Sequence, residues 1–308
     1  MAEQELPTGR ITPEDLTILF RRDTEKCLGE GTYGQVFKVS HLPSGKQFAL
    51  KVVKKVSEKV VERTLCEIQI LMIMKHPNIC KIHCFAENAE AIYIIMDLID
   101  GYNFLQFLKK YPGGLLKNLK LFWNIAEHFI AAIEFIHSRG IVHCDIKLQN
   151  VMVEISDSII QYIKVIDFGF SRDVREVSQF NGGTLHYMAP EILLSCAKGF
   201  GRDIWALGIT LFALITGNFP SQLESKNPDE KERRKEVRKN LRELGRMPPD
   251  QQFDPFLDPL RDYSAIPDEV KAFIRSCLIV NQESRPTAAV LRRRIQKILS
   301  SFDAKPDA

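Results

Sequence analysis

Apolar positions in the first part of the chain come in short runs separated by turn residues, a pattern that predicts strands. We expect strands on both sides of a turn within residues 26–38, and further strands at 48–53, 79–85 and 91–96. One segment has a different period. Apolar positions and one glutamate recur at helical spacing over residues 58–74. The first part of the chain is therefore predicted to be β-rich with one main helix.

Helical periodicity dominates the second part of the chain. It appears over residues 119–139, and residues 203–216 are apolar nearly all round, which predicts a buried helix. Residues 224–246 carry many charges of both signs and a narrow apolar stripe, which indicates an exposed helix docked on one side; a partner-binding surface is the alternative. Two further helices are expected near residues 267–278 and 287–299. The predicted fold class is α+β.

A polar loop at residues 143–150 lies between two apolar pairs, so we expect it to be held between buried strands. Its polar residues are suited to three tasks. Asp145 can accept a proton, Lys147 can hold negative charge, and Asn150 can offer an amide oxygen to a hard cation.

Lys51 and Glu67 are candidates for an ion pair. Ala49, Lys51 and Val53 share one face of a predicted strand, and Glu67 is the charge within the helical stripe. A carboxylate that faces the interior is costly unless it is paired. The alternatives are a lysine that snorkels at the sheet edge and a glutamate in water at the edge of its stripe.

Gly29, Gly31 and Gly34 lie in the turn between two predicted strands. Glycines lack Cβ, so the backbone amides of such a turn can approach a polyphosphate closely. Residues 36–39 are strand-like, which disfavours a dinucleotide-binding fold, because in that fold a helix follows the turn directly. An ordinary β-hairpin is the alternative.

Six motifs, taken in order, resemble those of the eukaryotic-type serine/threonine protein kinases. They are the glycine turn, Lys51, Glu67, the catalytic loop at Asp145, Asp167-Phe168-Gly169 and Ala189-Pro190-Glu191. The resemblance implies a bilobal protein-kinase-like fold, with a β-rich N-lobe that has one main helix and a mostly helical C-lobe. The implied divisions are a leader at 1–22, a kinase domain at 23–299 (N-lobe 23–96, hinge 97–101, C-lobe 102–299) and a tail at 300–308.

The resemblance also implies an ATP-dependent enzyme that transfers the γ-phosphate to serine or threonine hydroxyls of protein substrates. Asp145 would be the base, Lys147 would steady the transferring group, Thr184 would hydrogen-bond Asp145, and Glu67 would hold Lys51. Asn150 and Asp167 would hold Mg²⁺. Glu191 would pair with Arg285, and Asp203 would anchor the catalytic loop. The implied ATP-binding residues are Leu28, Gly29, Gly31, Gly34, Val36, Ala49, Lys51, Asp97, Ile99 and Asn150.

Several positions depart from the family pattern or refine it. Cys144 stands where many kinases have the arginine that pairs with a phosphorylated residue, so we expect activity without phosphorylation between residues 169 and 189. A nucleophilic role for Cys144 is the alternative. Phe170 favours serine over threonine as the acceptor. Asn103 and Gln149, neutral where arginine-directed kinases often carry glutamates, disfavour a strictly basophilic enzyme.

Composition adds few constraints. The 308 residues carry a net charge of +3, which by itself indicates neither nucleic acid nor membrane binding. Seven scattered cysteines suit reduced thiols, so we expect a cytoplasmic or nuclear protein. A zinc site at Cys80, His83 and Cys84 is a weak alternative. No apolar run approaches the roughly 20 residues of a membrane span, and the N-terminus has no signal core.

Two other functions stay open beside the kinase. A catalytically weak pseudokinase could act as a signalling scaffold, because fold alone does not define function. A kinase of small molecules is the second, although the Ala189-Pro190-Glu191 motif and the peptide-positioning segment before it weaken it. The short flanks leave little room for a regulatory domain, so we expect regulation by a protein partner.

Overall fold

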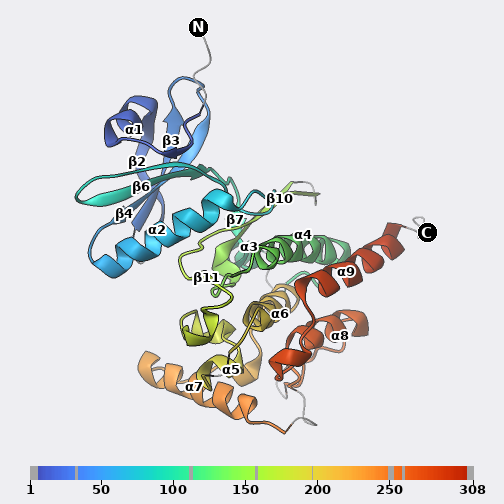
Figure 1. Cartoon of the computed structure of the whole chain (residues 1–308). Helices are drawn as coiled ribbons and strands as arrows, with labels where there is room; N and C mark the ends of the chain where they lie inside the picture. The colour runs from blue at the N-terminus through green and yellow to red at the C-terminus, as the bar shows by residue number, and fades with distance from the viewer. Residues whose placement is uncertain are drawn as a thin grey trace. The chain divides into compact units, whose positions relative to one another are not determined.

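The computed structural model describes residues 6–31, 34–110, 114–156, 159–195, 197–248, 253–258 and 261–303. The chain forms two compact units (Figure 1). The first comprises Met1–Asp100 with Asp167–Gly169, and the second comprises Gly101–Ile166 with Phe170–Ala308. The first unit is rich in strands and the second is mostly helical, which confirms the predicted α+β class.

A six-stranded sheet forms the first unit. Its strand order is β1-β5-β6-β4-β3-β2, with β1 parallel to β5 and the other neighbours antiparallel. The strands are β1 (Gly9–Arg10), β2 (Phe20–Gly31), β3 (Gly34–His41), β4 (Gln47–Lys54), β5 (Ile82–Glu87) and β6 (Ala91–Asp97). The predicted strands are present, although the one expected from residue 79 begins at Ile82. A turn precedes it, in which Ile79 N donates to His76 O over 3.1 Å.

Helix α1 (Pro13–Leu19) packs on one face of this sheet. Its start is a capping box, in which the Thr12 hydroxyl accepts from Asp15 N at 3.0 Å and the Asp15 carboxylate accepts from Thr12 N at 3.4 Å. Leu16 belongs to the same buried cluster as Phe48 and Leu50 of β4. Much of the segment expected as a leader is thus folded into the first unit.

Helix α2 (Glu58–Ile73) packs against β5, and its contact with Lys51 places it on the other face of β4. Ser57 caps the helix by accepting a hydrogen bond from Val60 N at 3.4 Å. The stripe predicted from the helical period is the buried face, which includes Val60, Thr64, Glu67 and Leu71.

The second unit contains seven α-helices and five short strands among the described residues. The helices are α3 (Phe104–Lys110), α4 (Leu119–Ser138), α5 (Pro190–Leu193), α6 (Gly201–Thr216), α7 (Glu230–Gly245), α8 (Asp268–Cys277) and α9 (Ala288–Asp303). The strands are β7 (Tyr102–Asn103), β8 (Ile141–Val142), β9 (Val151–Ser156), β10 (Ile159–Val165) and β11 (Arg172–Asp173). They form two small antiparallel sheets, β10-β9-β7 and β11-β8.

Helix α6 is the core of the second unit, because every residue from Arg202 to Thr216 is buried. It contacts α4 and α8, and α4 (green) runs beside α9 (red) in Figure 1. A helix buried on all sides explains the apolar composition that predicts it.

Helix α7 begins six residues later than the charge pattern predicts. Asp229 caps it, since its Oδ1 accepts from Glu232 N at 2.8 Å. Val237 and Leu241 are its buried residues, and most of its charged side chains are exposed, so the predicted one-sided docking is confirmed. A helix able to cross a membrane is absent from the part of the chain that the structure describes.

Glu191 at the start of α5 forms the implied ion pair with Arg285. Its oxygens lie 2.6 and 2.8 Å from the guanidinium, and both residues are buried. Arg285 also donates to Gly201 O at 2.9 Å, so this pair ties α5 to the start of α6.

Candidate active site

Lys51 on β4 and Glu67 on α2 form the predicted ion pair. The Lys51 Nζ atom lies 2.7 Å from Oε1 and 2.9 Å from Oε2 of Glu67, which is 4% exposed. Burial alone would lower the pKa of the Lys51 ammonium, but the carboxylates of Glu67 and Asp167 outweigh it and raise that pKa above its ordinary value. Lys51 is therefore charged at neutral pH.

Val36 and Ala49, the residues expected around adenine, lie on the sheet face that carries Lys51. The register pairs Val36 with Lys51 and Lys38 with Ala49. Directly paired residues of antiparallel strands point to the same side. The apolar pair and the ammonium therefore share one face of the first unit's sheet.

The three glycines of the predicted phosphate loop have different surroundings. Gly31 and Gly34 are paired in the β2–β3 register, and the two residues between them, Thr32 and Tyr33, lie outside the described part. A Cβ on Gly34 would lie 2.3 Å from Val52 O, whereas one on Gly29 would meet nothing within 4 Å. Gly34 is thus required by the approach of β3 to β4, and Gly29 faces no such restriction.

The other expected nucleotide contacts lie at a bulge in β2 and at the end of β6. Leu28 lies at the bulge and is 54% exposed. Asp97 ends β6, and its carboxylate binds His83 Nε2 at 2.9 Å and Lys81 N at 3.3 Å. Ile99 follows in an irregular segment and is partly buried. The contacts expected at Asp97 and Ile99 involve backbone groups and stay predictions.

Asp167 has a left-handed backbone conformation with φ 62°, which is strained for a residue other than glycine. Its Oδ1 accepts from Gly169 N at 3.2 Å, and Gly169 O accepts from Arg63 Nε at 2.6 Å. Arg63 lies one turn before Glu67, so α2 holds both Lys51 and this segment. Sequence reasoning misses Arg63, because its partner is a backbone oxygen.

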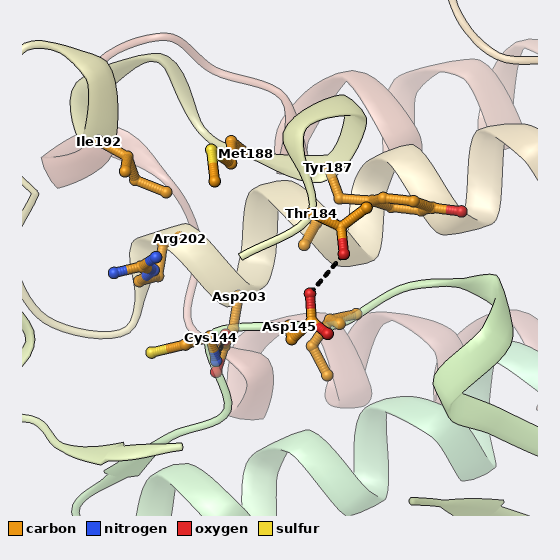
Figure 2. A pocket seen from close by; sticks show the side chains of 10 residues that line it. Cys144, Asp145, Thr184, Tyr187, Met188, Ile192, Arg202 and Asp203 are labelled. Atoms are coloured by element: carbon orange, nitrogen blue, oxygen red, sulfur yellow. Dashed lines mark hydrogen bonds between the residues drawn. The ribbon is translucent and has the colours of Figure 1, made fainter. Parts of the chain in front are cut away.

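Asp145 of the polar loop is 3% exposed and accepts three side-chain hydrogen bonds. Lys147 Nζ lies 2.6 Å and Asn150 Nδ2 lies 3.2 Å from its Oδ2. The Thr184 hydroxyl donates to its Oδ1 at 2.7 Å (Figure 2). Lys147 also donates to Thr184 Oγ1 at 3.1 Å. Lys147, Asn150 and Thr184, three predicted site residues of the second unit, therefore all contact Asp145.

Asn150 carries a carboxamide oxygen, a group that hard cations accept as a ligand. Its Nδ2 atom donates to the backbone oxygen of Asp145 at 2.9 Å, which directs its carboxamide oxygen elsewhere. Within the described ranges no group donates to that oxygen, and no three His, Cys, Asp or Glu side chains gather as a metal cluster. Mg²⁺ needs few protein oxygens because it keeps water and takes phosphate oxygens. The carboxamide oxygen of Asn150 and the carboxylate of Asp167 are each a type of ligand that this ion accepts.

Asp203 anchors the catalytic loop, as the resemblance implies. It accepts from His143 N at 2.7 Å and from Cys144 N at 2.9 Å. His137 Nε2 lies 3.0 Å from the same carboxylate, a contact that sequence reasoning misses. Burial alone would raise the pKa of Asp203, but the bonds from His137 and His143 lower it, so the carboxylate is charged at neutral pH.

Cys144 also has a left-handed backbone, with φ 67°. Its thiol is buried and lies 3.5 Å from Val142 O, and burial raises its pKa to about 12. The thiolate is the reactive form of cysteine, so a protonated, enclosed thiol argues against the nucleophilic role.

Comparison with known proteins places these features in one family. A model of the protein kinase domain matches residues 22–295. Serine/threonine-protein kinase D2 of Homo sapiens is 30% identical over 210 residues, which cover 67% of this chain and 24% of that protein. Putative ribosomal protein S6 kinase alpha-1 of Caenorhabditis elegans is 34% identical over 210 residues, which cover 66% and 26% of the two chains. Ribosomal protein S6 kinase beta of the same organism is 30% identical over 230 residues, which cover 71% and 40%.

The chain spans about a quarter of the length of the kinase D2 proteins that it matches. The family model covers most of this chain, and the similar proteins given above are named as a serine/threonine-protein kinase and as ribosomal protein S6 kinases. The chain therefore belongs to the protein kinase family, and several of its relatives are serine/threonine-protein kinases.

Proposed function

We propose that the chain transfers the γ-phosphate of ATP to serine or threonine hydroxyls of protein substrates. One observation carries this proposal. The buried carboxylate of Asp145 is held by Lys147 and Asn150 through Oδ2 and accepts a hydroxyl hydrogen bond from Thr184 through Oδ1. A carboxylate that already accepts from one hydroxyl is suited to orient another and take its proton.

Phosphoryl transfer depends on positioning and charge neutralisation more than on covalent catalysis. Asp145 would orient the acceptor hydroxyl and receive its proton, and the Lys147 ammonium beside it would stabilise negative charge on the transferring group. Lys51 would bind the α and β phosphates of ATP, with Glu67 fixing its direction. Asn150 and Asp167 are the residues that would hold Mg²⁺, which when bound supplies charge neutralisation at the phosphates.

Val36 and Ala49 would enclose the adenine, and the backbone of Asp97 and Ile99 would recognise its edge. Gly29, which has open space where a side chain would lie, would allow backbone amides to approach the phosphates. These nucleotide contacts all come from the first unit, whereas the groups that would act on the acceptor come from the second.

Transfer of radiolabelled γ-phosphate to a panel of proteins and metabolites tests the proposal. We expect labelled serine and threonine in proteins, magnesium dependence and no labelled metabolite. Labelled metabolites without labelled protein would favour the small-molecule kinase. If the purified chain binds nucleotide but labels no acceptor in the panel, the scaffold alternative would be favoured.

Acceptor preference can be proposed in more detail. Phe170 is the large residue after the Asp167–Gly169 segment, and we expect serine peptides to react faster than matched threonine peptides. Asn103 caps α3, since its Oδ1 accepts from Gln106 N at 2.8 Å, and it brings no negative charge to that position. A peptide library should therefore show no dominant arginine upstream of the acceptor.

The compartment remains a proposal as well. The six cysteines in the described ranges are free, which suits the reducing cytoplasm or nucleus. A fluorescent fusion that localises to a secretory compartment would contradict this expectation.

A further inference from the structure

Arg202, the second residue of α6, is buried with no carboxylate partner among the described residues. It is 3% exposed. Its Nη1 atom donates to Phe180 O at 2.8 Å, and its Nη2 atom donates to Gly182 O at 2.7 Å. A buried guanidinium is costly unless its donors find acceptors, and here two backbone carbonyls of one distant segment accept from two of its five N–H groups.

The segment that Arg202 holds leads directly to Thr184. Gly183 lies between them with φ 126°, and a Cβ there would lie 2.8 Å from Cys144 O. The backbone therefore passes closely over the catalytic loop before Thr184 reaches Asp145 at 2.7 Å. One residue, Gly183, therefore separates Gly182, whose carbonyl Arg202 binds, from Thr184, whose hydroxyl contacts Asp145.

Arg202 and Asp203 are consecutive, and each holds one of the two segments that meet at Asp145. Asp203 binds the backbone of His143 and Cys144, and Arg202 binds the backbone of the segment before Thr184. Figure 2 shows both side chains beside the small pocket where Thr184 joins Asp145. Because α6 is buried throughout, both anchors stand on a rigid support.

Phe180 adds an apolar attachment to the same segment. The Arg202 guanidinium lies 5.5 Å and the Arg172 guanidinium 4.7 Å from the centroid of the Phe180 ring. The ring packs with Phe170, at 5.9 Å between centroids, against the cluster that contains Cys144. No phosphate is needed to complete any of these contacts.

We propose that Arg202 is a positioning residue that holds the segment before Thr184 in its active geometry by binding backbone carbonyls, without phosphorylation of that segment. The proposal rests on the proposed kinase function. Cys144 has no positive charge with which to hold this segment. In the proposal, Arg202 of α6 holds it instead, by donating to main-chain oxygens.

The first test is a double-mutant cycle between Arg202→Met and Thr184→Val, with kcat and KM measured for a serine peptide and for ATP. Misplacement of a reacting group by about 1 Å slows a reaction roughly 100-fold. We therefore expect Arg202→Met to lower kcat by about 10- to 100-fold and to leave the KM for ATP unchanged. If Arg202 acts through Thr184, then adding Arg202→Met to the Thr184→Val variant should lower kcat by less than about threefold. Additive effects, or a kcat close to that of the unmodified chain, would overturn the proposal.

Two matched variants sharpen this comparison. Lysine at position 202 keeps the charge but cannot bind both carbonyls in the fork geometry of arginine, so Arg202→Lys should recover only part of the lost rate. Arg175 lies on the same segment but is an exposed residue paired with Asp173. Arg175→Met should therefore leave kcat within about twofold.

Hydrogen exchange provides a readout that does not depend on activity. In Arg202→Met, amides of residues 176–188 should exchange at least roughly tenfold faster, while those of α8 and α9 keep their rates. Unchanged exchange over residues 176–188 would overturn the proposal. Faster exchange in all parts of the chain would also overturn it, because it would indicate a general loss of stability and not the loss of a local anchor. If the unmodified chain transfers no phosphate, the proposed function fails, yet the exchange result still decides whether Arg202 holds the segment.

Discussion

The hydroxyl of Thr184 donates a 2.7 Å hydrogen bond to Oδ1 of Asp145, although the two residues lie 39 positions apart in the sequence. Lys147 contacts both, at 2.6 Å from Asp145 Oδ2 and 3.1 Å from Thr184 Oγ1. The two carboxylate oxygens are therefore distinguished by their partners. Oδ2 accepts from the two nitrogen donors, and Oδ1 accepts from a hydroxyl, the type of group that a kinase phosphorylates.

Removal of the Thr184 hydroxyl should slow catalysis. Thr184→Val keeps the side-chain shape but leaves the buried Oδ1 of Asp145 without its donor, so we expect kcat to fall roughly 10- to 100-fold. Thr184→Ser retains the hydroxyl and should stay within about threefold of the unmodified chain. Initial rates with a serine peptide at saturating ATP would check this, and equal rates for the two variants would contradict it.

Lys51 should stabilise the first unit up to strongly alkaline pH. Its folded pKa is raised above the ordinary 10.5, so its contribution is complete below about pH 10.5 and is lost as the pH rises through the folded pKa. We expect Lys51→Met to lower the free energy of unfolding by roughly 2–4 kcal/mol at pH 7, because it leaves Glu67 buried without its partner.

Urea unfolding between pH 7 and 11 would measure this difference, and the gap between the two proteins should narrow only at the top of that range. Lys54→Met, at an exposed position of the same strand, serves as the control and should change stability by less than about 0.5 kcal/mol. A gap that already closes near pH 8 would contradict the raised pKa.

Gly34 and Gly29 should respond differently to alanine. At Gly34 the new Cβ would collide with Val52 O, so Gly34→Ala should destabilise the chain by about 1–3 kcal/mol. At Gly29 there is open space, so Gly29→Ala should change the free energy of unfolding by less than about 0.5 kcal/mol. Any weakening of ATP binding by this variant would therefore report on contacts between the Gly29 backbone and the phosphates. Thermal unfolding with and without ATP distinguishes these effects, and equal destabilisation by both substitutions would count against this interpretation.

Activity should not require phosphorylation of the segment between residues 169 and 189. Ser171 is a poor probe, because it is buried and its hydroxyl donates to His143 O at 3.3 Å. Ser178 is exposed. We expect Ser178→Ala, and the unmodified chain after phosphatase treatment, to keep kcat within about twofold. A loss above tenfold in both would contradict the prediction.

Helix α2 illustrates which parts of the site could be predicted from sequence. Glu67 could be found because side-chain burial follows the helical period, and a charge within a buried stripe needs a partner. Arg63 on the same helix binds the backbone oxygen of Gly169, 106 residues away. A backbone acceptor is present at every residue and carries no sequence signal, so this contact required the structure.

The same reasoning applies to Arg202 and to the strained residues. An arginine at the start of an apolar helix resembles an ordinary solvated end, and only the fold brings the carbonyls of Phe180 and Gly182 to it. The left-handed backbones of Cys144 and Asp167 also lack a local signal, because neither residue type requires that conformation. The parallel pairing of β1 with β5 is likewise set by long-range packing.

The most direct test compares phosphate transfer by the unmodified chain and by Asp145→Asn at matched occupancy by magnesium and ATP. Asparagine keeps the shape of the side chain but is a far weaker proton acceptor, so we expect nucleotide affinity to be preserved and kcat to fall by about 10²- to 10⁴-fold. Equal transfer rates for the two proteins, with both fully loaded, would contradict the assignment of Asp145 as the base.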